Sequence, residues 1–294
     1  MKHIGIYVNS EKDYALTIAG KAIAYLLELG ALCCAEQEII NGLPLHIQSD
    51  ITILPASEFD RFADIVIAFG GDGTMLTAAR QFIGSDMPLM GVNVGRLGFL
   101  AEFNVQELEH ALKDLLSGGY RVVDRSMLEA EIHGKKYHAF NEFVFEKKDS
   151  SRLITTHIAN HQHLIASYRA DGVIIATPTG STAYSLSCGG PIITPSAEVL
   201  CITPISAHTL NMRPLIIPDT LELTVTLETM RGEARMVADG QIEIPLSDKD
   251  IVIVRRSKHM VKLVKHADST FFDLLRNKLL WSIDASIIET PQLF

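Results

Sequence analysis

The chain has 294 residues, of which 47% are hydrophobic and 21% are charged, and this balance excludes a disordered protein. Its net charge of −9 argues against a broad surface for nucleic acid or for an anionic membrane, so we expect neither as a partner. The four cysteines lack a CxxC spacing, and no apolar run reaches the roughly 18 residues of a membrane span, which together favour a cytoplasmic protein with free thiols.

The residues before about 122 alternate between strand-like and helix-like patterns. Residues 3–8 look like a first strand, too short and too polar at its flanks for a signal peptide. The remaining predicted elements, in chain order, are a helix at 11–29, strands at 33–40 and 65–69, a helix at 75–82, a strand at 89–92 and a helix at 106–116. Because such alternation is typical of a parallel sheet covered by helices, we predict an α/β domain of the Rossmann-like three-layer type over residues 1–122.

The turn between the strand at 65–69 and the helix at 75–82 is the most informative segment, with the sequence GGDGT at residues 70–74. Three glycines let the backbone turn sharply and approach a ligand closely. Amides at the start of a helix attract a phosphate. The predicted phosphate-binding residues are Gly70, Gly71, Gly73 and Thr74.

Asp72 is unexpected in such a turn, because a carboxylate repels a phosphate. The conflict disappears if a metal ion lies between the two groups, or if Asp72 accepts a proton from a hydroxyl. Both solutions point to phosphoryl transfer onto an alcohol. For these five residues alone, a plain strand-to-helix turn with Asp72 or Thr74 as the N-cap explains the sequence equally well.

From residue 123 to 265 the long helical periodicity is missing. The strand-like stretches there lie at 128–132, 137–145, 164–169, 221–227, 236–244 and 251–255. We therefore expect an all-β domain over 123–265, antiparallel and similar to a β-sandwich. Residues 266–294 return to a helix-like pattern at 271–280, and we expect this C-terminal segment to pack back on the α/β domain.

A second polar segment follows the strand-like residues 172–176. Five serine and threonine side chains lie within 177–185, and with the amides near Gly180 they can hydrogen-bond a ribose or a diphosphate. Tyr184 offers a flat surface for a base or a sugar. The alternative is a cluster of helix caps with a core tyrosine.

Asn141 and Glu142 interrupt an otherwise strand-like stretch. One of the two must face inward on a strand, where an amide or carboxylate without a partner is costly. A ligand contact and a simple turn or bulge are equally good explanations from the sequence.

These segments together resemble one family, the NAD kinases. The resemblance runs from about residue 64 to 245 and is most specific over 171–191. Its motifs, in order, are Gly70–Thr74, Gly91-Val92-Asn93, Leu97-Gly98-Phe99-Leu100, Asn141-Glu142, the block Asp171–Pro191 and Asp239-Gly240-Gln241. The shorter GGDG signature also occurs in 6-phosphofructokinases and in diacylglycerol and sphingosine kinases.

The resemblance implies transfer of the γ-phosphoryl group of ATP to the 2′-hydroxyl of the adenosine ribose of NAD, which gives NADP. Asp72 would accept or orient the proton of that hydroxyl, with Gly73 beside it, while Asn141 would bind the adenine and Glu142 a ribose. The nicotinamide end would lie near Asp171, Arg152 and Arg169. The residues expected to hold the dinucleotide are Thr182, Ala183, Tyr184, Ser185, Leu186 and Ser187, with Gln241 closing the pocket from the β domain.

The same resemblance implies NAD and ATP as substrates, Mg²⁺ carried with ATP, and a homodimer or homotetramer in which the β domain of one subunit completes the site of another. We predict no dedicated metal ligands, because Mg²⁺ commonly binds through the nucleotide with few protein ligands. Two alternatives stay open: a lipid or sugar kinase that shares the glycine turn, and a non-catalytic NAD-binding sensor. The sequence leaves undecided whether polyphosphate replaces ATP, whether NADH is accepted and whether NADP(H) feeds back.

Several other positions receive no function. Thr77 stands where several relatives carry a basic side chain, and Ala207 stands where many have a proline before the residue matching His208, so we assign His208 no role. The three histidines His157, His161 and His163 are more typical of a polar hairpin than of a zinc site. The charged run at 255–259 is predicted to be a solvated hairpin turn.

Overall fold

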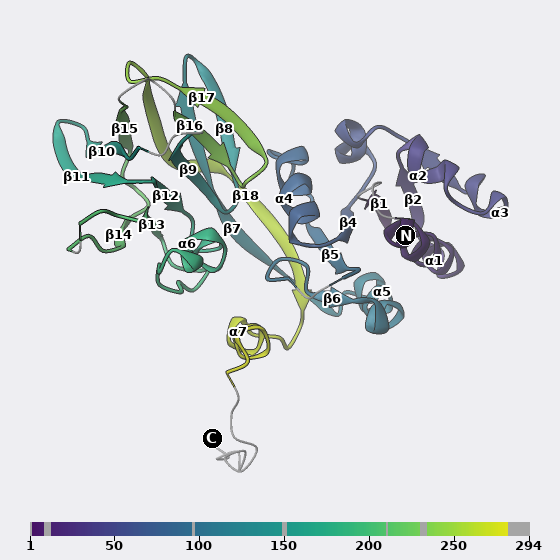
Figure 1. Cartoon of the computed structure of the whole chain (residues 1–294). Coiled ribbons are helices and arrows are strands. Elements are labelled where there is room, and N and C mark those ends of the chain that lie inside the picture. The colour runs from purple at the N-terminus through teal and green to yellow at the C-terminus, as the bar shows by residue number, and fades with distance from the viewer. Residues whose placement is uncertain are drawn as a thin grey trace, which may run out of the picture.

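The computed structural model describes residues 2–8, 13–95, 98–148, 152–209, 211–229 and 234–281. The start of the helix predicted at 11–29, Leu97 and the tail at 282–294 lie outside the described residues. Figure 1 shows a sheet-and-helix part at one end of the molecule and a part rich in strands at the other, joined by two long strands. No helix in the described ranges is long and apolar enough to cross a membrane.

The first part is built on a parallel sheet in the order β3-β2-β1-β4-β5. Its strands are β1 (His3–Val8), β2 (Leu32–Ala35), β3 (Ile51–Ile53), β4 (Ile65–Gly70) and β5 (Leu89–Asn93), and β6 (Phe103–Asn104) adds to β5. All six residues of β4 are buried, which explains the continuous apolar run at 65–69.

Helices cover both faces of this sheet. Helices α1 (Asp13–Glu28) and α5 (Leu108–Ser117) pack in one apolar cluster with the sheet, while α4 (Asp72–Gln81) and the 3-10 helix η1 (Ala56–Arg61) pack in another. Because helices cover both faces of a parallel sheet, the predicted three-layer α/β architecture is confirmed.

Two of the predicted elements differ at their ends. The strand predicted at 33–40 stops at Ala35, and α2 (Gln37–Asn41) and α3 (Leu45–Gln48) follow. The adjacent side chains of Ile39 and Ile40 are both buried by α2 packing on the core, so this apolar pair belongs to a short helix. The helix predicted at 106–116 is preceded by a 3-10 turn, η2 (Val105–Glu107), whose N-cap is Asn104.

The strand-rich part is two sheets facing each other. One is antiparallel in the order β14-β13-β12-β9-β16-β17, comprising β14 (Leu215–Pro218), β13 (Val199–Ile205), β12 (Gly172–Ala176), β9 (Glu142–Lys147), β16 (Ala234–Ala238) and β17 (Ile242–Leu246). The other contains β7 (Tyr120–Ile132), β8 (Lys135–Ala139), β10 (Ile154–Asn160), β11 (His163–Ala170), β15 (Leu223–Glu228) and β18 (Ile251–His266). Side chains of both sheets, including Phe143 and Phe145, form one buried cluster, which confirms the predicted sandwich-like arrangement.

Strands β7 and β18 join the two parts of the molecule. They pair antiparallel along their length, and Leu263 of β18 also pairs in parallel with Leu89 of β5. The parallel sheet therefore continues into the sandwich as a single sheet of twelve strands. Residue 122 lies inside β7.

The hairpin turn predicted at 255–259 is wrong, because these residues lie inside β18. Arg255 bonds to Glu129 on the neighbouring strand, and Arg256 bonds to Asp219 at 2.8 Å. The register against β7 shifts between Arg256 and Met260. The charges therefore mark cross-strand ion pairs around a bulge and do not mark a turn.

Helix α7 (Phe271–Leu279) follows β18 and ends the described chain. Thr270 caps its first turn together with Asp273. The ammonium group of Lys278 lies 5.7 Å from the ring centroid of Phe99, so α7 touches the loop that follows β5.

Candidate active site

Asp72 is the first residue of α4 and comes directly after the end of β4 and Gly71. Strand β4 lies between β1 and β5, and the helices that follow β1 and β4 cover opposite faces of the sheet. Open α/β sheets bind ligands in the crevice at such a point, outside the carboxyl ends of the strands. The glycine turn is therefore where this fold offers a ligand site.

The residues of the turn are not equally available. A Cβ on Gly70 would lie 2.0 Å from Oγ1 of Thr74, whose side chain is buried, so the Thr74 hydroxyl fills the space that Gly70 leaves. A Cβ on Gly71 would meet nothing within 4 Å, and Gly73 is exposed. Gly71 and Gly73 are therefore more accessible than the buried side chain of Thr74.

The Asp72 carboxylate is held by the loop that follows β5. Its Oδ2 accepts from the backbone N–H of Phe99 at 2.7 Å, and its Oδ1 accepts from Leu100 at 3.0 Å and Ala101 at 3.2 Å. A Cβ on Gly98 would lie 1.7 Å from Oδ1, so only glycine fits beside the carboxylate. The side chain of Asp72 is therefore fixed in place while it stays partly exposed.

Gln241 reaches α4 from the turn between β16 and β17. Its Nε2 donates to the carbonyl oxygen of Gly73 at 3.1 Å, and its Oε1 accepts from Oγ1 of Thr77 at 3.1 Å and from the guanidinium of Arg80. The structure thus brings Gln241 to the residue next to Asp72, although the two lie far apart in the sequence.

Asp239, two residues before Gln241, holds the corner between β8 and β9. Its oxygens accept from the backbone N–H groups of Phe140 at 2.9 Å, Asn141 at 2.7 Å and Glu142 at 3.3 Å. Its Oδ2 also pairs with Arg80 of α4 at 2.8 Å. Burial raises the pKa of Asp239, and the three amides and Arg80 act in the opposite direction.

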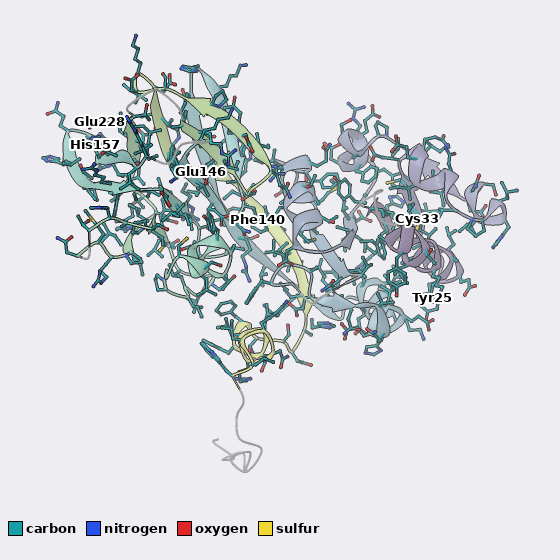
Figure 2. All side chains as sticks on the ribbon, viewed as in Figure 1. Tyr25, Cys33, Phe140, Glu146, His157 and Glu228 are labelled. Carbon is teal, nitrogen blue, oxygen red and sulfur yellow. The ribbon has the colours of Figure 1, made fainter. Side chains whose placement is uncertain are left out.

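This corner explains why Asn141 and Glu142 interrupt the strand pattern. They lie where the predicted strand at 137–145 divides into β8 and β9, so the turn alternative describes the backbone correctly. Phe140, just before them, is fully buried in the same apolar cluster as α4, and Figure 2 places it where the two parts of the molecule meet.

Glu142 is a buried carboxyl group with an unused oxygen. The residue is 5% exposed, and its Oε2 has no hydrogen-bond partner in the described part of the chain. Burial, and then the charge of Asp239, raise the pKa of Glu142 to about 8. A buried polar atom without a partner is costly, and a strongly shifted pKa in a crevice marks a candidate ligand contact.

The polar segment at 177–187 packs against the same corner. The backbone N–H of Thr177 donates to the carbonyl oxygen of Asn141 at 2.8 Å, and a Cβ on Gly180 would lie 2.1 Å from that oxygen. The segment then forms the 3-10 turn η3 (Gly180–Thr182) and the short helix α6 (Tyr184–Ser187).

The predicted dinucleotide residues of this segment face different ways. Tyr184 is 40% exposed and Ser187 is exposed, whereas Ser185 is fully buried and shares a hydrogen bond of 2.8 Å with Thr203. Thr182, Ala183 and Leu186 are partly exposed. The exposed Tyr184 is thus available to a ligand, while the Ser185 hydroxyl is used inside the β domain.

The residues predicted for the nicotinamide end lie on the β domain. Asp171, between β11 and β12, forms an ion pair of 2.5 Å with Lys147. Arg169 is exposed on β11, and Arg152 is exposed just before β10. The structure therefore pairs Asp171 with Lys147 and leaves the two arginines at the surface.

Arg80 is the main site residue that sequence reasoning missed. It lies three residues after Thr77, and positions i and i+3 share one face of a helix. Position 77 is a threonine and not a basic residue, and the next turn of the same helix face supplies the basic side chain. Its partner Asp239 lies 159 residues away, so no local pattern could have joined them.

A cluster of three or more histidine, cysteine, aspartate or glutamate side chains that could hold a metal ion does not occur among the described residues. The four cysteines are free thiols, and burial raises the pKa of Cys33 and of Cys34 to about 12.

Two family models match this chain, one over the α/β part of the fold and the other over the strand-rich part. The model of the ATP-NAD kinase N-terminal domain matches residues 4–120, and that of the ATP-NAD kinase C-terminal domain matches residues 140–266.

Curated relatives agree with the models. The chain is 37% identical over 287 residues to an NAD kinase of Heliobacterium modesticaldum, covering 95% of this chain and 99% of the relative. It is 38% identical over 290 residues to an NAD kinase of Bacteroides fragilis, covering 96% of this chain and 99% of the relative.

Solved structures share the fold. A yeast NADH kinase complexed with NADH has a TM-score of 0.85 at 24% identity, covering 99% of this chain and 90% of that chain. An NAD kinase from Archaeoglobus fulgidus in complex with ATP has a TM-score of 0.76 at 22% identity, covering 95% of this chain and 98% of that chain.

Proposed function

The chain belongs to the ATP-NAD kinase family, and on this premise we propose that Asp72 accepts or orients the proton of the 2′-hydroxyl of the adenosine ribose of NAD while the γ-phosphoryl group of ATP is transferred to that oxygen. One observation carries the proposal: the Asp72 carboxylate is fixed by three amides, partly exposed, at the ligand-binding end of the sheet. Transfer to this alcohol gives NADP and ADP.

Such a reaction needs alignment and electrostatic stabilisation more than covalent help from the protein. The loop at 98–101 provides alignment, because it fixes both oxygens of Asp72. A positioned general base contributes roughly 10² to 10⁴ in rate. The open backbone of Gly71 and Gly73 supports binding of the ATP phosphates in the turn that also contains Gly70 and Thr74.

We propose that NAD lies across the corner at Asn141 and Glu142, with adenine at Asn141 and a ribose at Glu142. The unpaired Oε2 of Glu142 supports this, because a ribose hydroxyl would supply the missing partner. Gln241, bonded to Gly73, would close the pocket. The dinucleotide would extend along Thr182–Ser187 to Asp171, Arg169 and Arg152, with exposed Tyr184 against it.

We propose that Mg²⁺ enters with ATP and neutralises charge on the phosphate oxygens when bound. The donor set fits a nucleotide-borne ion better than a protein cage, because Asp72 already accepts three amides and no metal-binding cluster occurs among the described residues. Asp72 is the carboxylate within the glycine turn, and it would face the ion when ATP is bound.

We also propose a cytoplasmic homodimer or homotetramer. The free thiols support a reducing compartment. The edge strand β14 carries the exposed apolar side chains Leu215 and Ile216, and such an edge favours pairing with another chain. Light scattering of the full chain should give twice or four times the monomer mass, and a monomer at micromolar concentration would contradict this.

The reaction itself is tested by incubating the full chain with ATP and either NAD or diacylglycerol, followed by product analysis. We expect NADP and no phosphorylated lipid. Phosphorylation of the lipid would favour another kinase that shares the glycine turn. Tight NAD binding without ATP-dependent formation of NADP would favour a non-catalytic sensor. Polyphosphate and other triphosphates, added as competing donors, define the donor range.

A further inference from the structure

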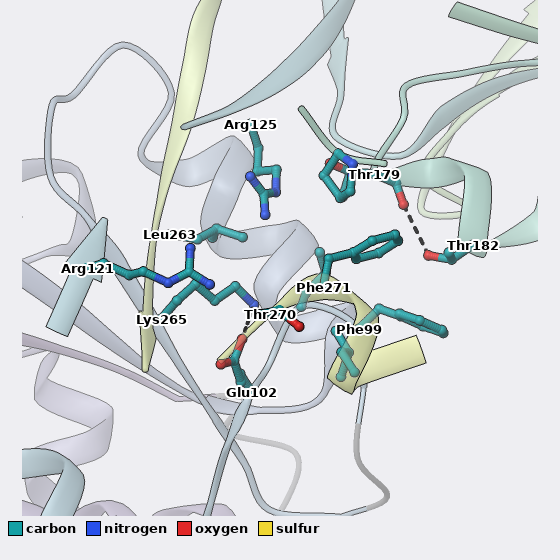
Figure 3. A pocket seen from close by; sticks show the side chains of 13 residues that line it. Phe99, Glu102, Arg121, Arg125, Thr179, Thr182, Leu263, Lys265, Thr270 and Phe271 are labelled. Carbon is teal, nitrogen blue, oxygen red and sulfur yellow. Dashed lines mark hydrogen bonds and ion pairs between the residues drawn. The ribbon is translucent and has the colours of Figure 1, made fainter. Parts of the chain in front are cut away.

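A polar cavity lies against the loop that holds Asp72, between β7, β18 and the start of α7 (Figure 3). We call it the arginine cavity. Its polar wall includes Arg121, Arg125, Lys265, Thr179 and Thr182. Its internal volume is about 40 Å³, which is room for a few water molecules or one phosphate-sized group.

The charge of the cavity is unbalanced. Lys265, which is buried, forms an ion pair of 2.8 Å with Glu102, the one carboxylate in the wall of the cavity. Burial raises the pKa of Glu102, but the charge and the hydrogen bond of Lys265 help to lower it overall. The opposite charges of this ion pair cancel. The two guanidinium groups remain, and the wall has a net charge of +2 in a chain whose net charge is −9.

Neither guanidinium is neutralised by an acid. Arg125 donates to the backbone oxygen of Asp124 at 3.0 Å, and Arg121 donates to the backbone oxygen of His266 at 3.1 Å. Over the ranges that the structure describes, no carboxylate oxygen lies within 4.0 Å of either group. Burial, and then the like charge of Arg121, lower the pKa of Arg125, and the weaker opposing charges of Glu102 and Asp124 do not offset them.

A hydroxyl in the same wall also lacks a partner. Thr179 is 8% exposed, and its Oγ1 is buried without a hydrogen bond among the described residues. Thr182 does not supply one, because its hydroxyl donates to the backbone oxygen of Thr179 at 3.2 Å, as the dashed line between these two residues in Figure 3 shows. A buried hydroxyl without a partner is costly, and an acceptor in the cavity would satisfy it.

We propose that the arginine cavity binds a phosphate-class oxyanion, held by the guanidinium of Arg125 and the hydroxyl of Thr179, with Arg121 adding charge. Such an ion carries the negative charge and the acceptor oxygens that these groups lack. Phe99 and Leu100 form part of the wall and donate to Asp72, so the bound oxyanion lies one loop away from that carboxylate. Binding itself is independent of catalysis, and only its assignment to a nucleotide phosphate rests on the proposed function.

The proposal is tested on the full chain without NAD or ATP, by calorimetry and thermal unfolding with inorganic phosphate against potassium chloride of equal ionic strength. Phosphate should bind and raise Tm. Arg125→Gln should weaken phosphate affinity about tenfold or more, because it removes charge-assisted hydrogen bonds. Thr179→Val should weaken it severalfold without lowering Tm of the free protein, because the hydroxyl has no protein partner to lose.

Arg61→Gln is the matched control, since it makes the same charge change at a side chain that is 76% exposed and outside the cavity. Its phosphate affinity should equal that of the unsubstituted chain. The proposal would be overturned if Arg125→Gln and Thr179→Val also kept the phosphate affinity of the unsubstituted chain. It would also be overturned if phosphate had no effect on Tm beyond that of chloride.

Competition with ADP identifies the source of the oxyanion. Displacement of phosphate by ADP assigns the cavity to a nucleotide phosphate, and independent binding of both assigns it to free phosphate. NADP formation, measured on the same preparations, reports on the proposed function separately, because a chain that makes NADP without binding phosphate here contradicts only the cavity.

Discussion

Asp72 and Asp239 are each held by three backbone N–H groups from a distant loop, residues 99–101 for the first and 140–142 for the second. They differ in exposure and in charge. The side chain of Asp239 has no exposed area and pairs with Arg80, whereas Asp72 is partly exposed and has no basic group within 4.0 Å in the described part of the chain. The comparison shows how one hydrogen-bonding arrangement can stabilise the fold in one region and leave a carboxylate free to meet a ligand in another.

The largest effect on stability is expected at Asp239, the carboxylate that stabilises the fold. Asp239→Asn leaves Arg80, whose side chain is only 14% exposed, without a counter-charge and weakens the corner at 140–142, so the free energy of unfolding should fall by about 3–5 kcal/mol. Urea unfolding measures this. The matched control is Asp86→Asn, which breaks an ion pair of the same 2.8 Å length at a side chain that is 97% exposed and should change stability little. Equal effects of the two substitutions would contradict the structural role of Asp239.

A second prediction concerns the loop that holds Asp72. Gly98→Ala adds a Cβ where Oδ1 of Asp72 lies 1.7 Å away, so the carboxylate or the loop must move. A misplacement of about 1 Å can cost roughly 10² in rate, and kcat for NADP formation should fall by that order. Gly42→Ala is the control, because its nearest neighbour would be 3.4 Å away and its φ is −81°. Wild-type kcat in Gly98→Ala would show that catalysis does not need this anchoring.

The smallest effect is a pH dependence at the corner between β8 and β9. The pKa of Glu142 is about 8 in the folded chain against a usual 4.5, so between these values the unfolded chain releases a proton that the folded chain keeps. Stability of the free protein should therefore decrease as pH rises from about 5 to 8. In Glu142→Gln this part of the decrease should vanish, while Glu28→Gln, at an exposed position on α1, should keep it. The same dependence of Tm on pH in all three chains would show that Glu142 does not keep its proton in the folded chain.

The sequence predicted those parts of the site whose residues are neighbours along the chain. The glycine turn, the buried strand before it and the helix after it lie within residues 65–82, and all three occur as expected apart from a helix start at Asp72. The alternation of apolar patterns likewise predicted the three-layer sheet and the sandwich, because burial on one or two faces leaves a period in the sequence.

What the sequence did not predict depends on contacts between distant residues. The amide donors of Asp72 come from 27 to 29 residues away, and Arg80 and Asp239 are 159 residues apart. Charged residues inside a strand, such as Arg255 in β18, look like a turn until their cross-strand partner Glu129 is known. Such pairs leave no periodic signal, so only the folded chain reveals them.

The most direct test compares Asp72→Asn with Asp239→Asn in the same preparation, with kcat for NADP formation, NAD affinity and urea unfolding measured for both. We expect Asp72→Asn to stay folded, to bind NAD within a few-fold of the unsubstituted chain and to lose roughly 10² or more in kcat. Asp239→Asn should instead show its main loss in the free energy of unfolding. A folded Asp72→Asn chain that makes NADP at the unsubstituted rate would contradict the claim that Asp72 takes part in the chemistry.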